Sequence, residues 1–233
     1  MRGIFSSELL RGVPDSMNVF ELSPTDPEPE LINQIASLLR EGGVIAYPTD
    51  TLYGLGGDGF NPDAHHRVMI LKGRDGAKPF LYIIDTVERL EKWRVPLGPI
   101  ADVIVKKFWP GPVSLIVKGT SELPGHVLDG NRNICLRLPD NNIARSIAGA
   151  LNGLLIATSA NLAGRAPACC AREAMGYFRG EIDAVVDGGP STRTVPSTVV
   201  DVTGDKAVIV REGIVPAERI RTAIAEAEKK QEP

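Results

Sequence analysis

Basic, hydroxyl and amide side chains recur in this sequence at points where strands and helices are predicted to end. Two of the cations, Lys72 and Arg74, stand two residues apart. Guanidinium and ammonium groups that converge bind anionic groups such as carboxylates and phosphates. A site rich in cations and hydroxyls but poor in bases suits phosphoryl chemistry, where positioning and charge neutralisation do most of the work. The candidate residues are Thr49, Thr51, Lys72, Arg74, Arg137, Ser159, Asn161, Ser197 and Arg211.

The residue types do not indicate other kinds of catalytic site. No Cys–His pair, no Ser–His–Asp set and no cluster of carboxylates stands out. Cys135, Cys169 and Cys170 have no metal-ligand spacing, so neither a metal site nor a disulfide framework is predicted. His65 and His66 are expected at the surface. The residues alone therefore indicate an anion or nucleotide pocket in an α/β domain.

Two stretches form the centre of this prediction. YPTDTLYGLG, at residues 47–56, leads an apolar strand into two threonines and a glycine-containing loop, where backbone can approach a ligand closely. LKGRDGAKPF, at residues 71–80, carries the basic pair at the end of a predicted helix that begins with the capping pair Asn61 and Pro62. Neither stretch has the spacing of a Walker loop or of a dinucleotide fingerprint.

Each piece also has an ordinary structural explanation. The threonine loop is equally explained as a hydrogen-bonded turn, and the basic pair as a solvated helix end. TSAN, at residues 158–161, follows a predicted strand, where open α/β sheets often place ligand contacts, but it also suits a simple Ser/Asn turn. Arg137 lies inside an apolar strand and must meet either an anionic ligand or an acidic neighbour, because an unpaired buried charge is strongly destabilising.

The hydrophobic pattern predicts helices and strands that would bring these residues together. Some strands are separated by helices and others by tight turns, which favours a mixed sheet over a purely parallel one. The loop at residues 123–133 is polar and expected to be exposed, and Thr86 is expected to cap a helix. Helical spacing is found at residues 31–39, 64–71, 86–93, 97–108, 142–151, 171–178 and 216–227. Strand-like runs lie at residues 44–47, 80–84, 113–118, 134–138, 154–157, 184–186, 197–202 and 207–213.

Length and composition set the limits of the prediction. The 233 residues suit one α/β domain, with an N-terminal extension at 1–27, a main domain at 28–220 and a C-terminal helix and tail at 216–233. No apolar run approaches the ~20 residues that a membrane-spanning helix needs. The cysteine usage favours a reducing, cytoplasmic location. A net charge of -3 argues against a surface devoted to nucleic acid.

Several motifs together make the chain similar to a known family. YPTDTLYGLG, LKGR, WPGP, the strand around Arg137, TSAN, STVVD and VREG occur in the order and rough spacing of the YrdC/YciO-like proteins, the L-threonylcarbamoyl-AMP synthases. The resemblance covers residues 31–219. It implies a twisted, open mixed sheet flanked by helices, of the YrdC/RibB-like kind. It also implies a nucleotidyltransferase that joins L-threonine, bicarbonate and ATP into threonylcarbamoyl-AMP and pyrophosphate.

The resemblance further implies partners and residue roles. The product would feed threonylcarbamoylation of a tRNA adenosine next to the anticodon, through downstream tRNA threonylcarbamoyl transferase proteins. Magnesium is expected with ATP, although the sequence shows no carboxylate cage for it. Thr51, Arg137 and Ser197 resemble the family's threonine contacts. Catalytic roles fall on the K-x-R pair, Lys72 and Arg74, and ATP contacts on that pair with Asn133, Ser159, Asn161 and Arg211.

Departures from the family pattern keep two other readings open. Many members carry Asn, His, Thr and Ser where this chain has Lys78, Ile83, Asn133 and Pro167. Ile83 would remove a threonine contact, which leaves room for a related carbamoyl-transfer enzyme with another amine substrate. KGTSELP, REGIVP and NNIARSIAGAL are similar to the YciO-like branch, which suggests a protein that binds double-stranded RNA or tRNA without this activity. Basic candidates for RNA contact are Lys106, Lys107, Lys118, Arg132, Arg165 and Arg172.

Overall fold

The structure of the protein is a computed structural model in which residues 17–73, 80–191 and 193–229 are described. The strands in these residues are β1 (Asn18–Glu21), β2 (Ile45–Tyr47), β3 (Gly54–Gly56), β4 (Leu81–Ile83), β5 (Val113–Lys118), β6 (Asn133–Arg137), β7 (Leu155–Ser159), β8 (Ala184–Asp187), β9 (Thr198–Asp201) and β10 (Val208–Arg211). The helices are α1 (Pro29–Arg40), α2 (Pro62–Leu71), α3 (Glu88–Lys92), α4 (Pro99–Phe108), the 3-10 turn η1 (Gly125–Val127), α5 (Asn142–Ala150), α6 (Ala171–Phe178) and α7 (Ala217–Lys229).

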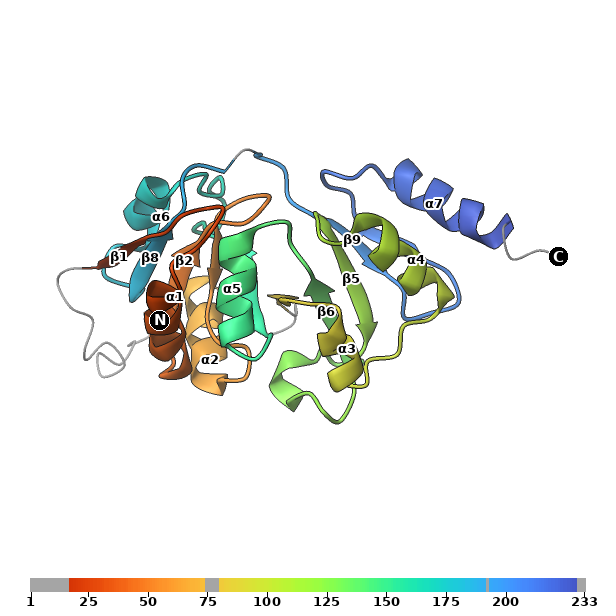
Figure 1. Ribbon diagram of the computed structural model, residues 1–233, viewed down its shortest axis with the longest axis horizontal. Helices are drawn as coiled ribbons and strands as arrows, with labels where there is room; N and C mark the ends of the chain where they lie inside the picture. The colour runs from red at the N-terminus through yellow and green to blue at the C-terminus, as the bar shows by residue number, and fades with distance from the viewer. Residues whose placement is uncertain (1–16, 74–79, 192, 230–233) are drawn as a thin grey trace, which may run out of the picture.

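The described strands form one mixed sheet (Figure 1), with the order β1-β8-β2-β3-β7-β4-β6-β5-β9-β10. The pairs β1–β8, β2–β8, β4–β6 and β5–β9 are parallel. The other neighbours, β2–β3, β3–β7, β4–β7, β5–β6 and β9–β10, are antiparallel. The predicted α/β class, an open mixed sheet flanked by helices, is therefore confirmed.

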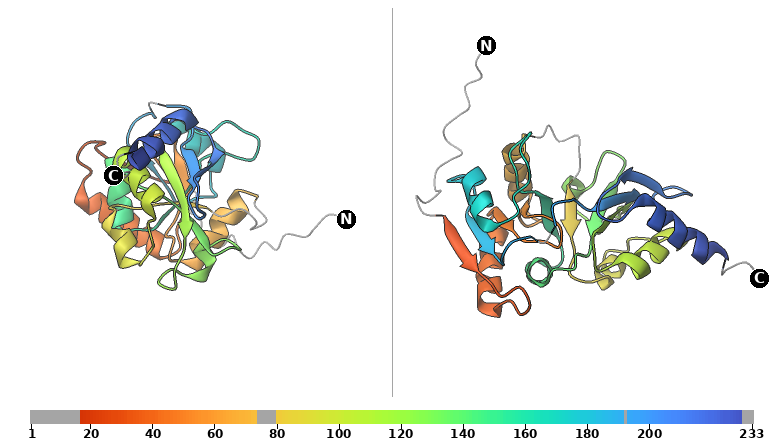
Figure 2. Two further views of the ribbon diagram at one scale, coloured as in Figure 1. Left: turned by 90° about the vertical axis from the view of Figure 1, so that its right-hand side faces the viewer. Right: turned by 90° about the horizontal axis from the view of Figure 1, so that it is seen from above.

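Helices pack on both faces of this sheet. On one face, α1 and α5 bury Ile35, Leu39, Ile143 and Ile147 against residues of β2, β4, β7 and β8. On the other face, α2, α4, α6 and α7 pack on a second and larger apolar cluster. Figure 1 shows α5 near the middle of the molecule, and the view from above in Figure 2 places α7 at the end opposite β1.

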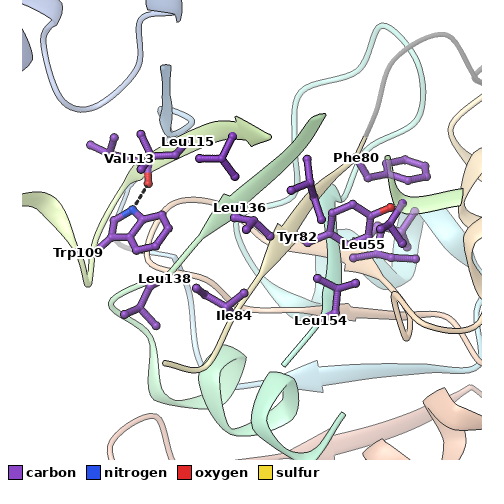
Figure 3. Packing of buried hydrophobic residues seen from close by; sticks show 14 of the residues in the cluster. Leu55, Phe80, Tyr82, Ile84, Trp109, Val113, Leu115, Leu136, Leu138 and Leu154 are labelled. Carbon is purple, nitrogen blue, oxygen red and sulfur yellow. Dashed lines mark hydrogen bonds between the residues drawn. The ribbon is translucent and has the colours of Figure 1, made fainter. Parts of the chain in front are cut away.

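The side chains that point into the larger cluster show which side chains of the same strands point to the other face of the sheet. Tyr82 of β4 and Leu136 of β6 point into it (Figure 3). The indole of Trp109 is buried there, and its Nε1 donates to the carbonyl oxygen of Val113 at 2.6 Å, so its one polar atom is paired. Because side chains alternate along a strand, Arg137 points away from this cluster, toward the face that carries α1 and α5.

Two local predictions are wrong. Thr86 does not cap a helix, because α3 begins at Glu88 after the N-cap residue Val87, and no side chain caps it. The loop at residues 123–133 is not wholly exposed, since Leu123 and Val127 are buried in the larger cluster. Leu123, Val127 and Leu128 are the apolar aliphatic side chains of this otherwise polar stretch, and three residues are too few to predict this burial from periodicity.

The sheet begins inside the segment that the sequence predicts as an N-terminal extension. β1 pairs in parallel register with β8, and the following residue, Leu22, is buried with α1. The four residues of β1 are too few to show an alternating pattern. In the described part of the chain, no helix is both long enough and apolar enough to cross a bilayer.

Candidate functional site

The candidate side chains of the central strands point to the sheet face that carries α1 and α5, called here the site face, whereas Lys72 comes from the end of α2, which packs on the other face. Cys135 of β6 is level with Leu81 of β4, which is level with Ala157 of β7. Ser159 lies two residues beyond this level in one direction, and Arg137 lies two residues beyond it in the other. The predicted residues therefore lie diagonally across the site face, with roughly 13 Å between Ser159 and Arg137 along the strand direction.

The first group of candidates lies at the turn that follows β2. The Thr49 hydroxyl donates to the carbonyl oxygen of Leu52 at 2.6 Å and accepts from the backbone N–H of Thr51 at 3.1 Å. Because the hydrogen of Thr49 is used in this way, the Thr51 hydroxyl must be the donor in the 3.0 Å contact between the two threonines. The guanidinium of Arg137 then donates to Thr51 Oγ1 at 3.4 Å. Thr51 therefore offers a ligand an acceptor rather than a donor.

Arg137 also has an acidic partner, which the sequence reading did not identify. Its Nη2 donates to Asp50 Oδ1 at 3.0 Å, and the two side chains are 3% and 7% exposed. Among the described residues, Arg137 Nε and Asp50 Oδ2 are buried with no hydrogen-bond partner. The ion pair foreseen as the structural alternative is therefore present. The only sequence feature that could have indicated this partner is the motif PTDT, in which the aspartate directly precedes Thr51.

The second group joins the end of α2 to the end of β7. As predicted, Asn61 caps α2, since its Oδ1 accepts from the backbone N–H groups of Asp63 and Ala64. Lys72 is the C-cap residue of the same helix. Its Nζ donates to Ser159 O, Asn161 O and Asn161 Oδ1, each at 2.7 Å. The predicted K and S-x-N residues are thus in direct contact, whereas Arg74 lies outside the described residues.

The third group lies where β5, β9 and β10 meet. Arg211 donates to the carbonyl oxygen of Ser197 at 2.9 Å and to its hydroxyl at 3.2 Å. The Ser197 hydroxyl also contacts the hydroxyl of Ser114, at 3.0 Å. Partial burial lowers the pKa of Arg211 below its usual value, and the nearby positive charge of Arg137 acts in the same direction. Ser114 was not a candidate, because a single serine in an apolar strand carries no signal.

Cys135 lies between the second and third groups but is not a nucleophile. Burial raises the pKa of its thiol to about 12, although the positive charges of Arg211 and Arg137 oppose this shift. The thiol is therefore neutral near pH 7, and a neutral thiol is a weak nucleophile. Its position on the site face makes it part of the wall of the candidate site.

One other predicted contact is less well placed. Asn133 is buried, and its backbone N–H and side-chain amide donate to Asp129, at 2.8 and 3.3 Å. In the described part of the chain, no hydrogen bond joins Asn133 to the other candidates, and its Oδ1 is buried without a partner. Ile83 is level with Arg137 and fully buried in the α1/α5 layer. An apolar side chain thus lies beside the guanidinium.

Some basic and histidine residues have structural partners. Lys106 pairs with Asp102, and Lys107 pairs with Glu226 of α7. His65 is half-buried rather than fully exposed, whereas His66 is exposed as predicted. The ring of His65 lies 4.9 Å from that of Phe80, and burial lowers the pKa of His65 to about 4.

The described residues do not form a protein cage for a metal ion. Over residues 17–73, 80–191 and 193–229, no group of three or more His, Cys, Asp or Glu side chains could hold one. Apart from the carboxylate of Asp50, which pairs with Arg137, the candidate groups are cations, hydroxyls and an amide. These groups suit a ligand that carries phosphate or carboxylate oxygens, and a magnesium ion would arrive on such phosphates.

The sequence matches known proteins over most of its length. The profile of the Sua5/YciO/YrdC family, described as "Telomere recombination", matches residues 37–213. The chain is 32% identical over 191 residues to the threonylcarbamoyl-AMP synthase of Pyrococcus abyssi, covering 82% of this chain and 56% of that protein. It is 38% identical over 168 residues to the threonylcarbamoyl-AMP synthase of Thiobacillus denitrificans, covering 72% and 89%. The chain thus spans just over half of the first relative and most of the second.

Two solved structures have a similar fold. P. abyssi Sua5 complexed with L-threonine matches with a TM-score of 0.83 and 31% identity, over 89% of this chain and 61% of that chain. E. coli YciO matches with a TM-score of 0.80 and 30% identity, over 88% of this chain and 100% of that chain.

Proposed function

The chain belongs to the Sua5/YciO/YrdC family, and from this premise we propose that it is an L-threonylcarbamoyl-AMP synthase, a nucleotidyltransferase. Its substrates would be L-threonine, bicarbonate and ATP, and its products threonylcarbamoyl-AMP and pyrophosphate. Relatives with the name threonylcarbamoyl-AMP synthase support the activity, and the Sua5 structure with bound L-threonine supports the amino acid. The product would pass to proteins that modify tRNA.

One observation carries this proposal. Three separate polar groups lie on one sheet: Arg137 and Ser197 with Arg211 are on the site face, and Lys72 reaches the end of β7 from α2. The roughly 13 Å along the strands between Arg137 and Ser159 suits a product with threonine at one end and adenosine at the other. A structural ion pair or a solvated helix end alone would not require all three groups to lie on the same sheet.

The chemistry needs positioning more than it needs a base. Bicarbonate supplies carbon dioxide by losing hydroxide, and the neutral amine of threonine forms a bond to that carbon and releases a proton. One oxygen of the carbamate then bonds to the α-phosphorus of ATP, while the bond from that phosphorus to the bridging oxygen breaks and pyrophosphate leaves. Two anions must approach each other in this step. Cations offset the repulsion between these anions. Each donor that is held in place for the transition state can raise the rate roughly 100-fold.

Arg137 is the proposed contact for the threonine carboxylate. Its partner Asp50 makes the pair neutral overall, yet Nε still lacks an acceptor among the described residues. Arg137 is only 2% exposed, so a carboxylate reaches it after neighbouring side chains move. Threonine binding is therefore proposed to include a local rearrangement around the turn that holds Asp50 and Thr51.

The decisive test is the dependence of pyrophosphate release on the amino acid. Purified protein with ATP, bicarbonate and magnesium is expected to release pyrophosphate when L-threonine is added, and not in its absence. Serine, valine and the α-hydroxy analogue of threonine serve as controls, because they remove the methyl group, the side-chain hydroxyl and the amine in turn. Equal release with every amino acid, or without any, would contradict the assignment of threonine.

The same panel decides between the synthase and its alternatives. The buried side chain of Ile83 beside Arg137 favours testing apolar amino acids, because it offers no hydrogen bond to a substrate hydroxyl. Preference for valine over threonine would indicate a related enzyme with another amine substrate. The likeness to E. coli YciO supports measuring RNA affinity as well. Binding of double-stranded RNA that falls steeply with salt, without any amino-acid-dependent turnover, would favour the RNA-binding alternative.

A further inference from the structure

Two adjacent thiols, Cys169 and Cys170, take no part in the proposed reaction. Both side chains are partly exposed, and they lie in the segment that leads into α6, which packs beside β8 (Figure 1). Cys170 is the N-cap residue of α6, and its side chain makes no capping hydrogen bond to that helix. The helix therefore does not hold its sulfur in place, and solvent can reach it.

The backbone next to these thiols joins three loops, two of which carry candidate site residues. Ala168 donates its N–H to the carbonyl oxygen of Ala160 at 2.9 Å, and its own carbonyl oxygen accepts from the N–H of Tyr53 at 3.1 Å. The carbonyl oxygen of Cys169 accepts from the N–H of Ser191 at 2.7 Å. These partners lie in the loops that follow β7, β2 and β8, respectively. A displacement of this segment would therefore disturb all three loops together.

The two thiols differ in reactivity. Burial, followed by the charges of Glu173 and Cys170, raises the pKa of Cys169. The Cys169 thiol also points a weak hydrogen bond at the carbonyl oxygen of Pro167, at 3.8 Å. Cys170 lies near the phenol of Tyr53, whose pKa is raised by burial and then by negative charges that include Cys170. Because the thiolate is the reacting form of a cysteine, Cys170 is the better nucleophile of the two.

A small-molecule disulfide is the class of reagent that suits this thiol. Cys170 loses its proton to water, and its sulfur attacks one sulfur of the reagent, R–S–S–R. A new S–S bond forms to Cys170, the S–S bond of the reagent breaks, and the other half leaves as a thiolate that takes up a proton. This exchange transfers half of the reagent to the protein and needs no further oxidant.

The neighbouring cysteine is poorly placed to reverse the modification. Reversal from within the chain would require a disulfide between Cys169 and Cys170, which are joined by a trans peptide bond. Consecutive Cα atoms across such a bond are about 3.8 Å apart, whereas the Cα atoms of a disulfide are usually about 4.4 to 6.8 Å apart. Closure would therefore be strained, and the mixed disulfide should persist until an external thiol attacks it.

We propose that Cys170 is a site of reversible S-thiolation by small-molecule disulfides, and that the modification lowers turnover by displacing the loops after β2 and β7. The attached group would lie beside Tyr53, whose hydroxyl donates to the carbonyl oxygen of Gly189 at 2.8 Å and so joins the loops after β2 and β8. The site of modification is independent of the proposed function, whereas its effect on turnover rests on that function.

Mass spectrometry after treatment with oxidised glutathione tests the site of modification. The native wild type is expected to gain one glutathione group, on Cys170, which dithiothreitol removes, while Cys135 stays unmodified. Cys169→Ser should gain the same adduct, and Cys170→Ser should gain none. Serine is a favourable N-cap residue, so Cys170→Ser is expected to fold. No adduct, an adduct mainly on Cys169, or a disulfide between the two cysteines would overturn the inference.

Amide hydrogen exchange tests whether the modification disturbs the loops, and it requires no enzymatic activity. The N–H groups of Tyr53 and Ser191 donate to the segment that carries the thiols. They are expected to exchange severalfold faster in the glutathionylated protein than in the reduced protein. The N–H of Gly59, which donates to the carbonyl oxygen of Leu154 at 2.8 Å, is the internal control and should be unchanged. Unchanged exchange at Tyr53 and Ser191 would overturn the proposed displacement.

Turnover tests the link between the modification and the proposed function. The glutathionylated wild type is expected to lose at least about tenfold in kcat/KM for L-threonine, because small displacements of positioning groups are costly, and dithiothreitol should restore the activity. Cys170→Ser, treated in the same way, should keep its activity. Full activity of the modified wild type would overturn the proposed effect on turnover. Absence of L-threonine-dependent turnover before treatment would instead remove the proposed function, and the adduct and exchange measurements would still decide the site of modification.

Discussion

At the scale of single residues, the pair of Asp50 and Arg137 links the amino-acid end of the site to the stability of the fold. The sequence showed that Arg137 must meet an anion, because its strand neighbours are apolar. It could not show which anion, since Asp50 lies 87 residues away in the chain and has the spacing of an ordinary turn residue. The same reasoning found Thr51 and Ser197 as candidates but missed Ser114, whose role depends on the pairing of distant strands.

Removing either member of this pair should destabilise the protein. Arg137→Ala leaves a buried carboxylate without its partner, and Asp50→Ala leaves a buried guanidinium, so each is expected to lower the free energy of unfolding by about 3–5 kcal/mol. The double variant should lose less than the sum of the two, because no uncompensated charge remains. Urea denaturation measures these differences, with Ser121→Ala as the control. Strict additivity would show that the pair contributes no coupling.

At the scale of elements, α2 shows what a local pattern can and cannot predict. Its N-cap at Asn61 was predicted from capping chemistry, and its end at Lys72 was predicted from the spacing of apolar residues. Its contact with η1 was not, because it depends on how the chain returns after β5. His65 of α2 lies 5.5 Å from the ring of His126, and His126 Nε2 lies 3.0 Å from the carbonyl oxygen of Gly59. Local periodicity carries no information about such contacts.

His65 should make the stability of the protein depend on pH. Its folded-state pKa is about 4, lowered mainly by burial and then by the nearby charge of His126, whereas an unfolded histidine titrates near 6.5. The unfolded chain therefore binds more protons between these values. Stability is expected to be full above about pH 6.5 and to fall as the pH falls toward 4.

Matched histidine variants isolate this effect in thermal melts recorded across that pH window. His65→Phe keeps a ring beside Phe80 and should show a smaller decrease in Tm on acidification. His66→Phe alters the exposed neighbouring residue and should follow the wild type. Identical pH profiles for the wild type and His65→Phe would show that His65 does not contribute.

At the scale of the whole molecule, the sequence predicted the kinds of elements but not their order in the sheet. Alternating helices and strands indicated a mixed α/β sheet. That β7 lies next to β4, and β5 next to β9, depends on pairing between segments far apart in the sequence. The diagonal layout of the site follows from that pairing. The edge strand β1 was missed for a related reason, since four residues acquire strand structure only by pairing with β8.

The contribution of β1 can be measured with two matched substitutions. Leu22 directly follows β1 and is 6% exposed, while Val19 within β1 is 44% exposed. Leu22→Ala is expected to lower the free energy of unfolding by about 2–3 kcal/mol, because it leaves a cavity beside α1. Val19→Ala should change it by less than about 1 kcal/mol, since it removes little buried surface. Equal effects in urea denaturation would show that this segment does not pack as described.

The three thiols of the chain divide into two classes with different access to reagents. Cys169 and Cys170 are only partly covered, whereas Cys135 is buried at the centre of the sheet between two guanidinium groups. Under native conditions an alkylating reagent should modify the first two faster than the third, although burial and the charge of Glu173 raise the pKa of Cys169. The reagent should reach Cys135 only when the middle strands separate. The rate of the slow alkylation phase therefore reports how often the sheet opens at its centre. A ligand bound across that centre should lower this rate.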